Sequence, residues 1–100
     1  MERANKPNFV FFIADQLRAD ALGHLNPQGA ATPNFEKLAG DGVSFRNAYC
    51  QNPVCVPSRC SMLTGWYPHT KGHRTMHFLL DEDDPTMLEQ LKMNGYEVIW

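Results

Sequence analysis

The chain has 100 residues, of which 43% are hydrophobic and 20% charged, and its formal net charge is −2. This composition is typical of a globular protein and excludes the disordered, collagen-like and fibrous classes. The basic residues are scattered and the charge is close to neutral, which argues against a nucleic-acid surface. Any anion binding must therefore be local.

No targeting or membrane segment is predicted. The longest apolar run, residues 9–14, has six residues, whereas a membrane span needs about 20 and the apolar part of a signal peptide about 7–15. The three cysteines, Cys50, Cys55 and Cys60, are an odd number in a close cluster and do not suggest a disulfide framework. A cytoplasmic location is therefore favoured, with a periplasmic or secreted one as the alternative if an upstream signal has been removed.

The apolar run over residues 8–14 predicts the first strand of the protein. Continuous rather than alternating apolarity favours a strand buried on both faces, as in a parallel sheet covered by helices. Asp15 and Gln16 follow at its carboxyl end, where open α/β sheets place their sites. From the residues alone, Asp15 is either a functional carboxylate or the N-cap of a short helical segment over residues 17–22.

The next stretch predicts a turn over residues 26–29 and a helix that begins with Thr32 as N-cap and Pro33 as first residue. Its apolar stripe consists of Phe35, Leu38 and Ala39, and Gly40 and Gly42 end it. Residues 43–49 alternate apolar and polar side chains, which indicates a short strand or extended segment.

Residues 55–65, CVPSRCSMLTG, predict a second helix. Pro57 suits the first helical turn and Gly65 the end, so that Cys55 lies just ahead of the N-terminus. Unpaired N–H groups and the positive end of the helix dipole favour an anion there, and Arg59 follows about one turn later. The pattern predicts an anion cradle with a nucleophile at its mouth.

The last part of the chain predicts a helix followed by a strand. The helix runs from Asp84 as N-cap to Gly95 as C-terminal stop, with Met87, Leu88, Leu91 and Met93 toward the core. Residues 96–100 form the strand and complete a βαβ-like pattern. The acidic run over residues 81–84 is interpreted as a solvated loop and helix cap.

Residues 55–65 resemble the signature of the type I sulfatases of the alkaline phosphatase superfamily, C-x-P-S-R followed two residues later by Met/Leu-Leu-Thr-Gly. Residues 32–39 resemble a second sulfatase segment, and the resemblance covers nearly the whole chain. It implies an α/β fold, the N-terminal part of an alkaline-phosphatase-like three-layer sandwich with a mostly parallel central sheet. Residues 1–100 would be the N-terminal segment of one catalytic domain, ending after its second core strand.

The resemblance also implies the chemistry, which is hydrolysis of sulfate esters. Cys55 matches the cysteine that is converted to formylglycine (3-oxoalanine), and Arg59 matches the arginine that stabilises it and the sulfate. A divalent cation would be held by Asp15, Gln16 and the converted Cys55. Ca²⁺ is the first expectation, with Mg²⁺ or Mn²⁺ as alternatives, because Gln16 stands where many members have a second Asp.

The partners implied are a small-molecule or saccharide sulfate ester and a formylglycine-generating or anaerobic sulfatase-maturating enzyme. In the implied mechanism the aldehyde hydrates to a geminal diol, one hydroxyl attacks sulfur, and deprotonation of the other expels sulfate. The remaining Lys, His and metal ligands are expected beyond residue 100, so the fragment alone is expected to be inactive. His73, Arg74 and His77 are candidates for substrate binding, because the chain leaves the active helix there.

Two alternatives remain open at this point. The resemblance also includes a phosphonate monoester or phosphodiester hydrolase of the same superfamily, which can carry Asp-Gln at the first strand, although the intact Pro57 and Ser58 favour sulfate. A non-catalytic zinc-binding or partner-binding module would instead use the cysteine cluster and the regularly spaced histidines, His69, His73 and His77.

Overall fold

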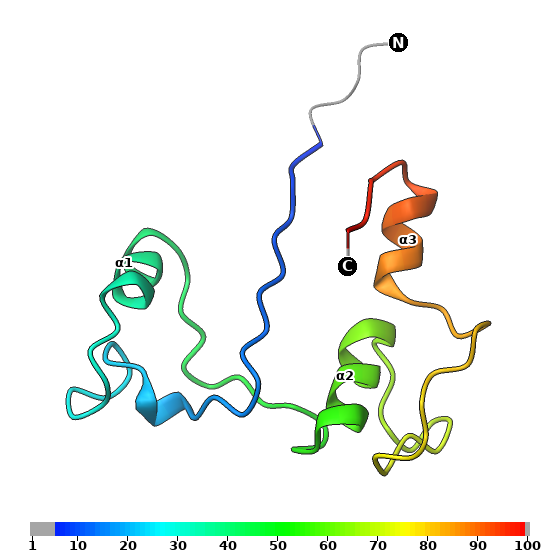
Figure 1. Cartoon of the computed structure of the whole chain (residues 1–100), viewed down its shortest axis with the longest axis horizontal. Coiled ribbons are helices and arrows are strands. Elements are labelled where there is room, and N and C mark those ends of the chain that lie inside the picture. The colour runs from blue at the N-terminus through cyan, green and yellow to red at the C-terminus, as the bar shows by residue number, and fades with distance from the viewer. Residues whose placement is uncertain (1–5, 100) are drawn as a thin grey trace. The chain divides into compact units, whose positions relative to one another are not determined.

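The computed structural model of the chain describes residues 6–99 and contains four helical elements in this region (Figure 1). They are the 3-10 helix η1 (Ala19–Ala21) and the α-helices α1 (Pro33–Asp41), α2 (Cys55–Thr64) and α3 (Met87–Met93). The chain divides into two compact units, with the boundary between Arg46 and Asn47.

The strands predicted from the sequence are not formed within residues 6–99. The first predicted strand, residues 8–14, is irregular chain with exposed side chains; Val10 is 94% and Phe12 76% exposed. A parallel strand needs neighbouring strands to pair its N–H and C=O groups. Residues 43–45 and 96–99 are likewise irregular, and Trp100 lies outside the described residues. The α/β sheet therefore stays a prediction.

In the first unit, the predicted turn and helix start are confirmed. The Gly29 N–H donates to the Asn26 carbonyl oxygen at 2.8 Å, which closes the turn. Helix α1 begins at Pro33 with Thr32 as N-cap. The Thr32 hydroxyl, however, accepts from the Gly23 N–H at 2.9 Å rather than from the helix. Thr32 thus ties the preceding turn to the start of α1.

The end and the apolar face of α1 differ from the prediction. The helix continues through Gly40 to Asp41, and Gly42 is its C-cap, so Gly40 does not end it. Phe35 is 37% exposed and Leu38 68% exposed. Ala39 is half-buried, and no residue between 6 and 46 is fully buried.

In the second unit, α2 begins one residue earlier than predicted, since Cys55 is its first residue and Val54 its N-cap. Pro57 lies in the first turn, as predicted, and its side chain is fully buried. Gly65 ends the helix in the left-handed conformation, with φ of 76°, and its N–H donates to the Ser61 carbonyl oxygen at 2.8 Å. Gly65 is confirmed as the stop.

Helix α3 is shorter than predicted, and its N-cap is Thr86 rather than Asp84. The Thr86 hydroxyl accepts from the Glu89 N–H at 3.1 Å. Asp84 cannot cap α3 because its carboxylate has partners in the preceding loop. Of the predicted core residues, Leu88 and Leu91 are half-buried, whereas Met87 and Met93 are 39% and 74% exposed, which makes the prediction wrong for the two methionines.

Burial in the described chain is concentrated around α2, which also contacts α3. The buried residues all belong to the second unit; they are Pro57, Cys60, Ser61, Pro68, His73 and Asp84. No helix within residues 6–99 is long and apolar enough to cross a membrane.

Candidate active site

Cys55 and Arg59 lie on one side of α2. Because an α-helix turns by about 100° per residue, residues four apart are separated by only about 40° around the axis. The buried residues of this helix, Pro57, Cys60 and Ser61, form a stripe on the other side. Cys55 is accordingly half-buried and Arg59 exposed. The helix therefore turns this buried stripe inward and directs its two predicted catalytic residues away from it.

The N-terminus of α2 is the end at which an anion site is predicted. The first helical hydrogen bond runs from the Ser58 N–H to the Val54 carbonyl oxygen at 2.9 Å. The helix's own hydrogen bonds start at Ser58, Pro57 has no N–H group, and the dipole makes this end of α2 positive. A nucleophile at Cys55 would act at this positive end.

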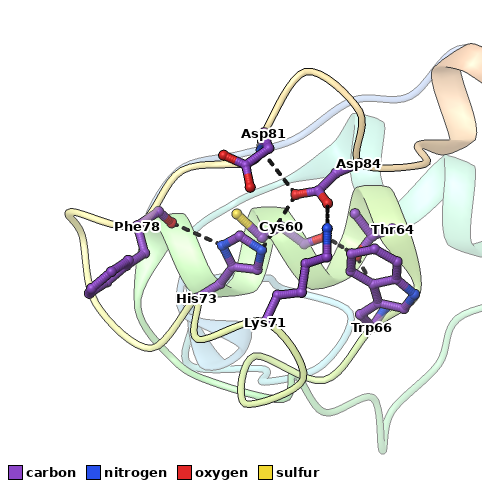
Figure 2. Close-up of polar contacts among 8 residues, drawn as sticks. All are labelled: Cys60, Thr64, Trp66, Lys71, His73, Phe78, Asp81 and Asp84. Atoms are coloured by element: carbon purple, nitrogen blue, oxygen red, sulfur yellow. Dashed lines mark hydrogen bonds and ion pairs between the residues drawn. The ribbon is translucent and has the colours of Figure 1, made fainter.

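The C-terminal end of α2 is fixed by side-chain hydrogen bonds. The Thr64 hydroxyl donates to the Cys60 carbonyl oxygen at 2.7 Å and accepts from the Trp66 N–H at 3.1 Å. Figures 1 and 2 both show the chain turning after this point and returning alongside α2. The following loop therefore packs against the helix that carries Cys55.

A buried carboxylate lies at the centre of this loop (Figure 2). Asp84 is 2% exposed, forms an ion pair with the Lys71 ammonium, and accepts from the Asp81 N–H at 2.9 Å. The Lys71 ammonium also lies 5.1 Å from the centre of the Trp66 ring. The bond from Lys71, followed by that from the Asp81 N–H, lowers the pKa of Asp84, and the same ion pair raises the pKa of Lys71.

The sequence predicts that the acidic run over residues 81–84 is a solvated loop. This prediction is confirmed for residues 81–83, which are exposed, and is wrong for Asp84, which is buried. The charge of Asp84 is compensated by Lys71, 13 residues earlier in the chain. A pattern of neighbouring residues carries no signal for such a pairing.

His73, one of the predicted substrate-binding residues, is buried. It is 4% exposed, and its Nδ1 donates to the Phe78 carbonyl oxygen at 3.2 Å. Its Nε2 lies 3.8 Å from Asp84 Oδ2, which is beyond hydrogen-bond distance. Of the three residues predicted to bind substrate, only Arg74 and His77 are exposed.

The cysteines and histidines do not assemble a zinc site in the part of the chain that the structure describes. Cys50 is exposed, Cys55 half-buried and Cys60 buried. Burial, and secondarily the charge of Asp84, raises the pKa of the Cys60 thiol, so its metal-binding thiolate form is disfavoured. The segment that holds His69 and His77 consists of turns rather than a helix.

Asp15 and Gln16 form an exposed turn directly after the first predicted strand. Gln16 has φ of 52° and is the one non-glycine residue within residues 6–99 with a positive φ. A single left-handed residue other than glycine costs roughly 1–2 kcal/mol, and such strain is concentrated at functional turns. Asp15 does not cap η1, whose N-cap residue is Arg18.

The oxygen atoms of Asp15 and Gln16 suit a hard cation such as Ca²⁺, which takes about 6–8 oxygen ligands. No group of three or more Asp, Glu, His or Cys residues that could hold a metal is found within residues 6–99. These two residues therefore fit part of a ligand set.

Several curated proteins are similar to the chain over most of its length. An ulvan-active sulfatase of Formosa agariphila is 37% identical over 99% of the chain and 19% of its own length. An N-acetylgalactosamine-6-O-sulfatase of Bacteroides thetaiotaomicron is 35% identical over 95% of the chain and 20% of its own length. A human steryl-sulfatase is 34% identical over 93% of the chain and 18% of its own length.

The chain thus spans about a fifth of the length of the curated relatives it matches. No solved structure is significantly similar to it. The family model described as Sulfatase matches residues 7–100, and the chain belongs to the sulfatase family.

Proposed function

We propose that the protein hydrolyses sulfate esters with a formylglycine, made from Cys55, as its nucleophile. The observation that carries the proposal is the position of Cys55 as first residue of α2, with Arg59 four residues later on the same side. Membership of the sulfatase family supports the reaction. It also favours sulfate over the phosphonate and phosphodiester alternative.

In this proposal the Cys55 thiol is oxidised by a maturating enzyme to an aldehyde, which adds water to give a geminal diol. One diol oxygen attacks the sulfur atom, and the bond from sulfur to the alcohol oxygen breaks as the alcohol leaves with a proton. The second diol hydroxyl then loses its proton, the C–O bond to the sulfate breaks, and the aldehyde returns. Arg59 and the N–H groups at the start of α2 stabilise the charge on the sulfate oxygens.

Asp15 and Gln16 are proposed ligands of a divalent cation, together with the converted Cys55. Ca²⁺ is preferred because both side chains offer oxygen atoms, and Mg²⁺ or Mn²⁺ are the alternatives. When bound, such a cation polarises sulfate oxygens and acidifies a nearby hydroxyl. The left-handed backbone of Gln16 supports a functional rather than incidental turn.

We further propose that the chain is the N-terminal segment of an α/β domain of the alkaline-phosphatase type, with residues 8–14 as a central strand. The exposed side chains of this run, among them Phe9, Val10 and Phe12, support the assignment because they need a covering layer. The further Lys, His and metal ligands are expected in the parts that the relatives have beyond this region.

The test is mass spectrometry across residues 55–59 of the full-length protein, combined with turnover of 4-nitrophenyl sulfate. Conversion of thiol to aldehyde should lower the peptide mass, and Cys55→Ala should abolish turnover, whereas Cys50→Ala serves as the matched control. Full activity with an unmodified Cys55 would contradict the mechanism. Faster turnover of bis(4-nitrophenyl) phosphate than of the sulfate ester would favour the phosphodiesterase alternative.

A further inference from the structure

Residues 73–78 form a closed loop beside α2. The hydrogen bond from His73 Nδ1 to the Phe78 carbonyl oxygen joins its two ends, and the His73 ring is buried beneath it. The backbone is tightened further by the Arg74 N–H, which donates to the Gly72 carbonyl oxygen at 2.7 Å. Both hydrogen bonds therefore stabilise the loop from within.

The two flanks of this loop are tied together by Asp84. Its carboxylate pairs with Lys71 on one side and accepts the Asp81 N–H on the other. Because Asp84 is buried, opening the loop would expose its charge or leave it without a partner. In both Figure 1 and Figure 2 the loop lies toward the end at which α2 begins.

The charge around this loop favours anions. None of the eleven Asp and Glu residues of the chain falls between residues 47 and 80, a stretch that contains Arg59, Lys71 and Arg74. The positive charge of Lys71 is compensated by its ion pair with Asp84. Arg74 and His77 are exposed on the loop, and the side chains of both have no hydrogen bond or ion pair to another described residue.

We propose that Arg74 and His77 form a subsite for a second anionic group of the substrate, so that substrates with two or more anionic groups are preferred over esters with a single sulfate. The inference rests on the proposed function. A preformed loop makes such a subsite effective because the side chains that bind need not be ordered at the moment of binding. An arginine fork suits a sulfate or a carboxylate equally.

The test compares two inhibitors of 4-nitrophenyl sulfate turnover by the full-length enzyme, inorganic sulfate and sucrose octasulfate. The ratio of their Ki values reports whether a second anionic group is bound. Loss of one charge-assisted contact corresponds to roughly tenfold in affinity, so Arg74→Gln should reduce the preference for sucrose octasulfate about tenfold. His77→Gln, which removes the second side chain of the subsite, should also reduce this preference.

Lys92→Gln is the matched control, because Lys92 is an exposed cation of the same unit on α3. It should leave turnover and both Ki values unchanged. If the ratio of the two Ki values were the same in the wild type and in Arg74→Gln, the subsite would be overturned. An equally large reduction of the preference for sucrose octasulfate in Lys92→Gln would overturn it as well. Calorimetric titration of the full-length Cys55→Ala variant with sucrose octasulfate gives the same comparison without turnover. An enzyme that binds the octasulfate through Arg74 but cleaves no sulfate ester would refute the proposed function and leave the subsite in place.

Discussion

Lys71 and Asp84 form an ion pair across 13 positions of the chain, and the carboxylate of this pair is buried while the ammonium remains partly exposed. The pair closes the loop that returns alongside α2, the helix on which Cys55 and Arg59 lie. Truncation of one partner leaves the other without compensation, which is more harmful than loss of an exposed ion pair.

The first prediction concerns acid stability. The pKa of Asp84 is lowered in the folded protein, so its contribution to stability is present above its unfolded-state pKa, about 3.9, and is lost as the pH falls through the lower folded-state value. The midpoint temperature of thermal unfolding of the wild type should therefore decrease as the pH is lowered below about 4. Asp84→Asn should be less stable at pH 7 and less sensitive to acid.

Asp83→Asn is the control for this measurement, because Asp83 is exposed in the same acidic run. It should resemble the wild type at every pH. The pH dependence of the Lys71 contribution has the opposite sign, because the pKa of Lys71 is raised in the folded protein. Its contribution to stability is lost only as the pH rises through this folded-state pKa, above about 10. Equal acid sensitivity of Asp84→Asn and the wild type would count against a structural role for the pair.

The second prediction compares two glycines at which an added Cβ would touch nothing within 4 Å. Gly65 has φ of 76°, so Gly65→Ala should lower the free energy of unfolding by about 1–2 kcal/mol through backbone strain alone. Gly40 lies inside α1, so Gly40→Ala should raise it by about 0.5–1 kcal/mol. Urea denaturation of the full-length variants measures both, and effects of the same sign would contradict the argument.

The third prediction concerns the cap of α3. Thr86→Ala removes the hydroxyl that accepts from the Glu89 N–H and should cost about 1 kcal/mol of unfolding free energy. Thr86→Ser keeps the acceptor and should leave the free energy of unfolding nearly unchanged, because serine is at least as good an N-cap as threonine. Thr70→Ala, at an exposed threonine of the same unit, is the control. If Asp84 rather than Thr86 capped the helix, as the sequence alone predicts, Thr86→Ala would be silent.

The features that the sequence predicts correctly are local. The Asn26 turn, the start of α1 at Pro33 and the end of α2 at Gly65 depend on residues within one or two turns of the chain. The same holds for the side of α2 shared by Cys55 and Arg59, since helical spacing alone determines it.

The features that the sequence does not predict depend on distant partners. The burial of Asp84 requires Lys71, and the burial of His73 requires the Phe78 carbonyl group. The strand predicted for residues 8–14 needs neighbours that are not supplied within residues 6–99. Apolar composition gives the tendency to form a strand, but pairing gives the strand itself.

The last prediction tests the proposed metal site at Gln16. Its backbone is left-handed, a conformation that Asp and Asn tolerate better than most residues. Gln16→Asp and Gln16→Asn should therefore both relieve strain, but only Gln16→Asp adds a negative charge. Because ligand charge tunes Ca²⁺ affinity, Gln16→Asp should tighten Ca²⁺ binding by roughly tenfold in calorimetric titration of the chelator-treated full-length enzyme. Gln16→Asn should bind no more tightly than wild type, and equal affinities in all three proteins would place the cation elsewhere.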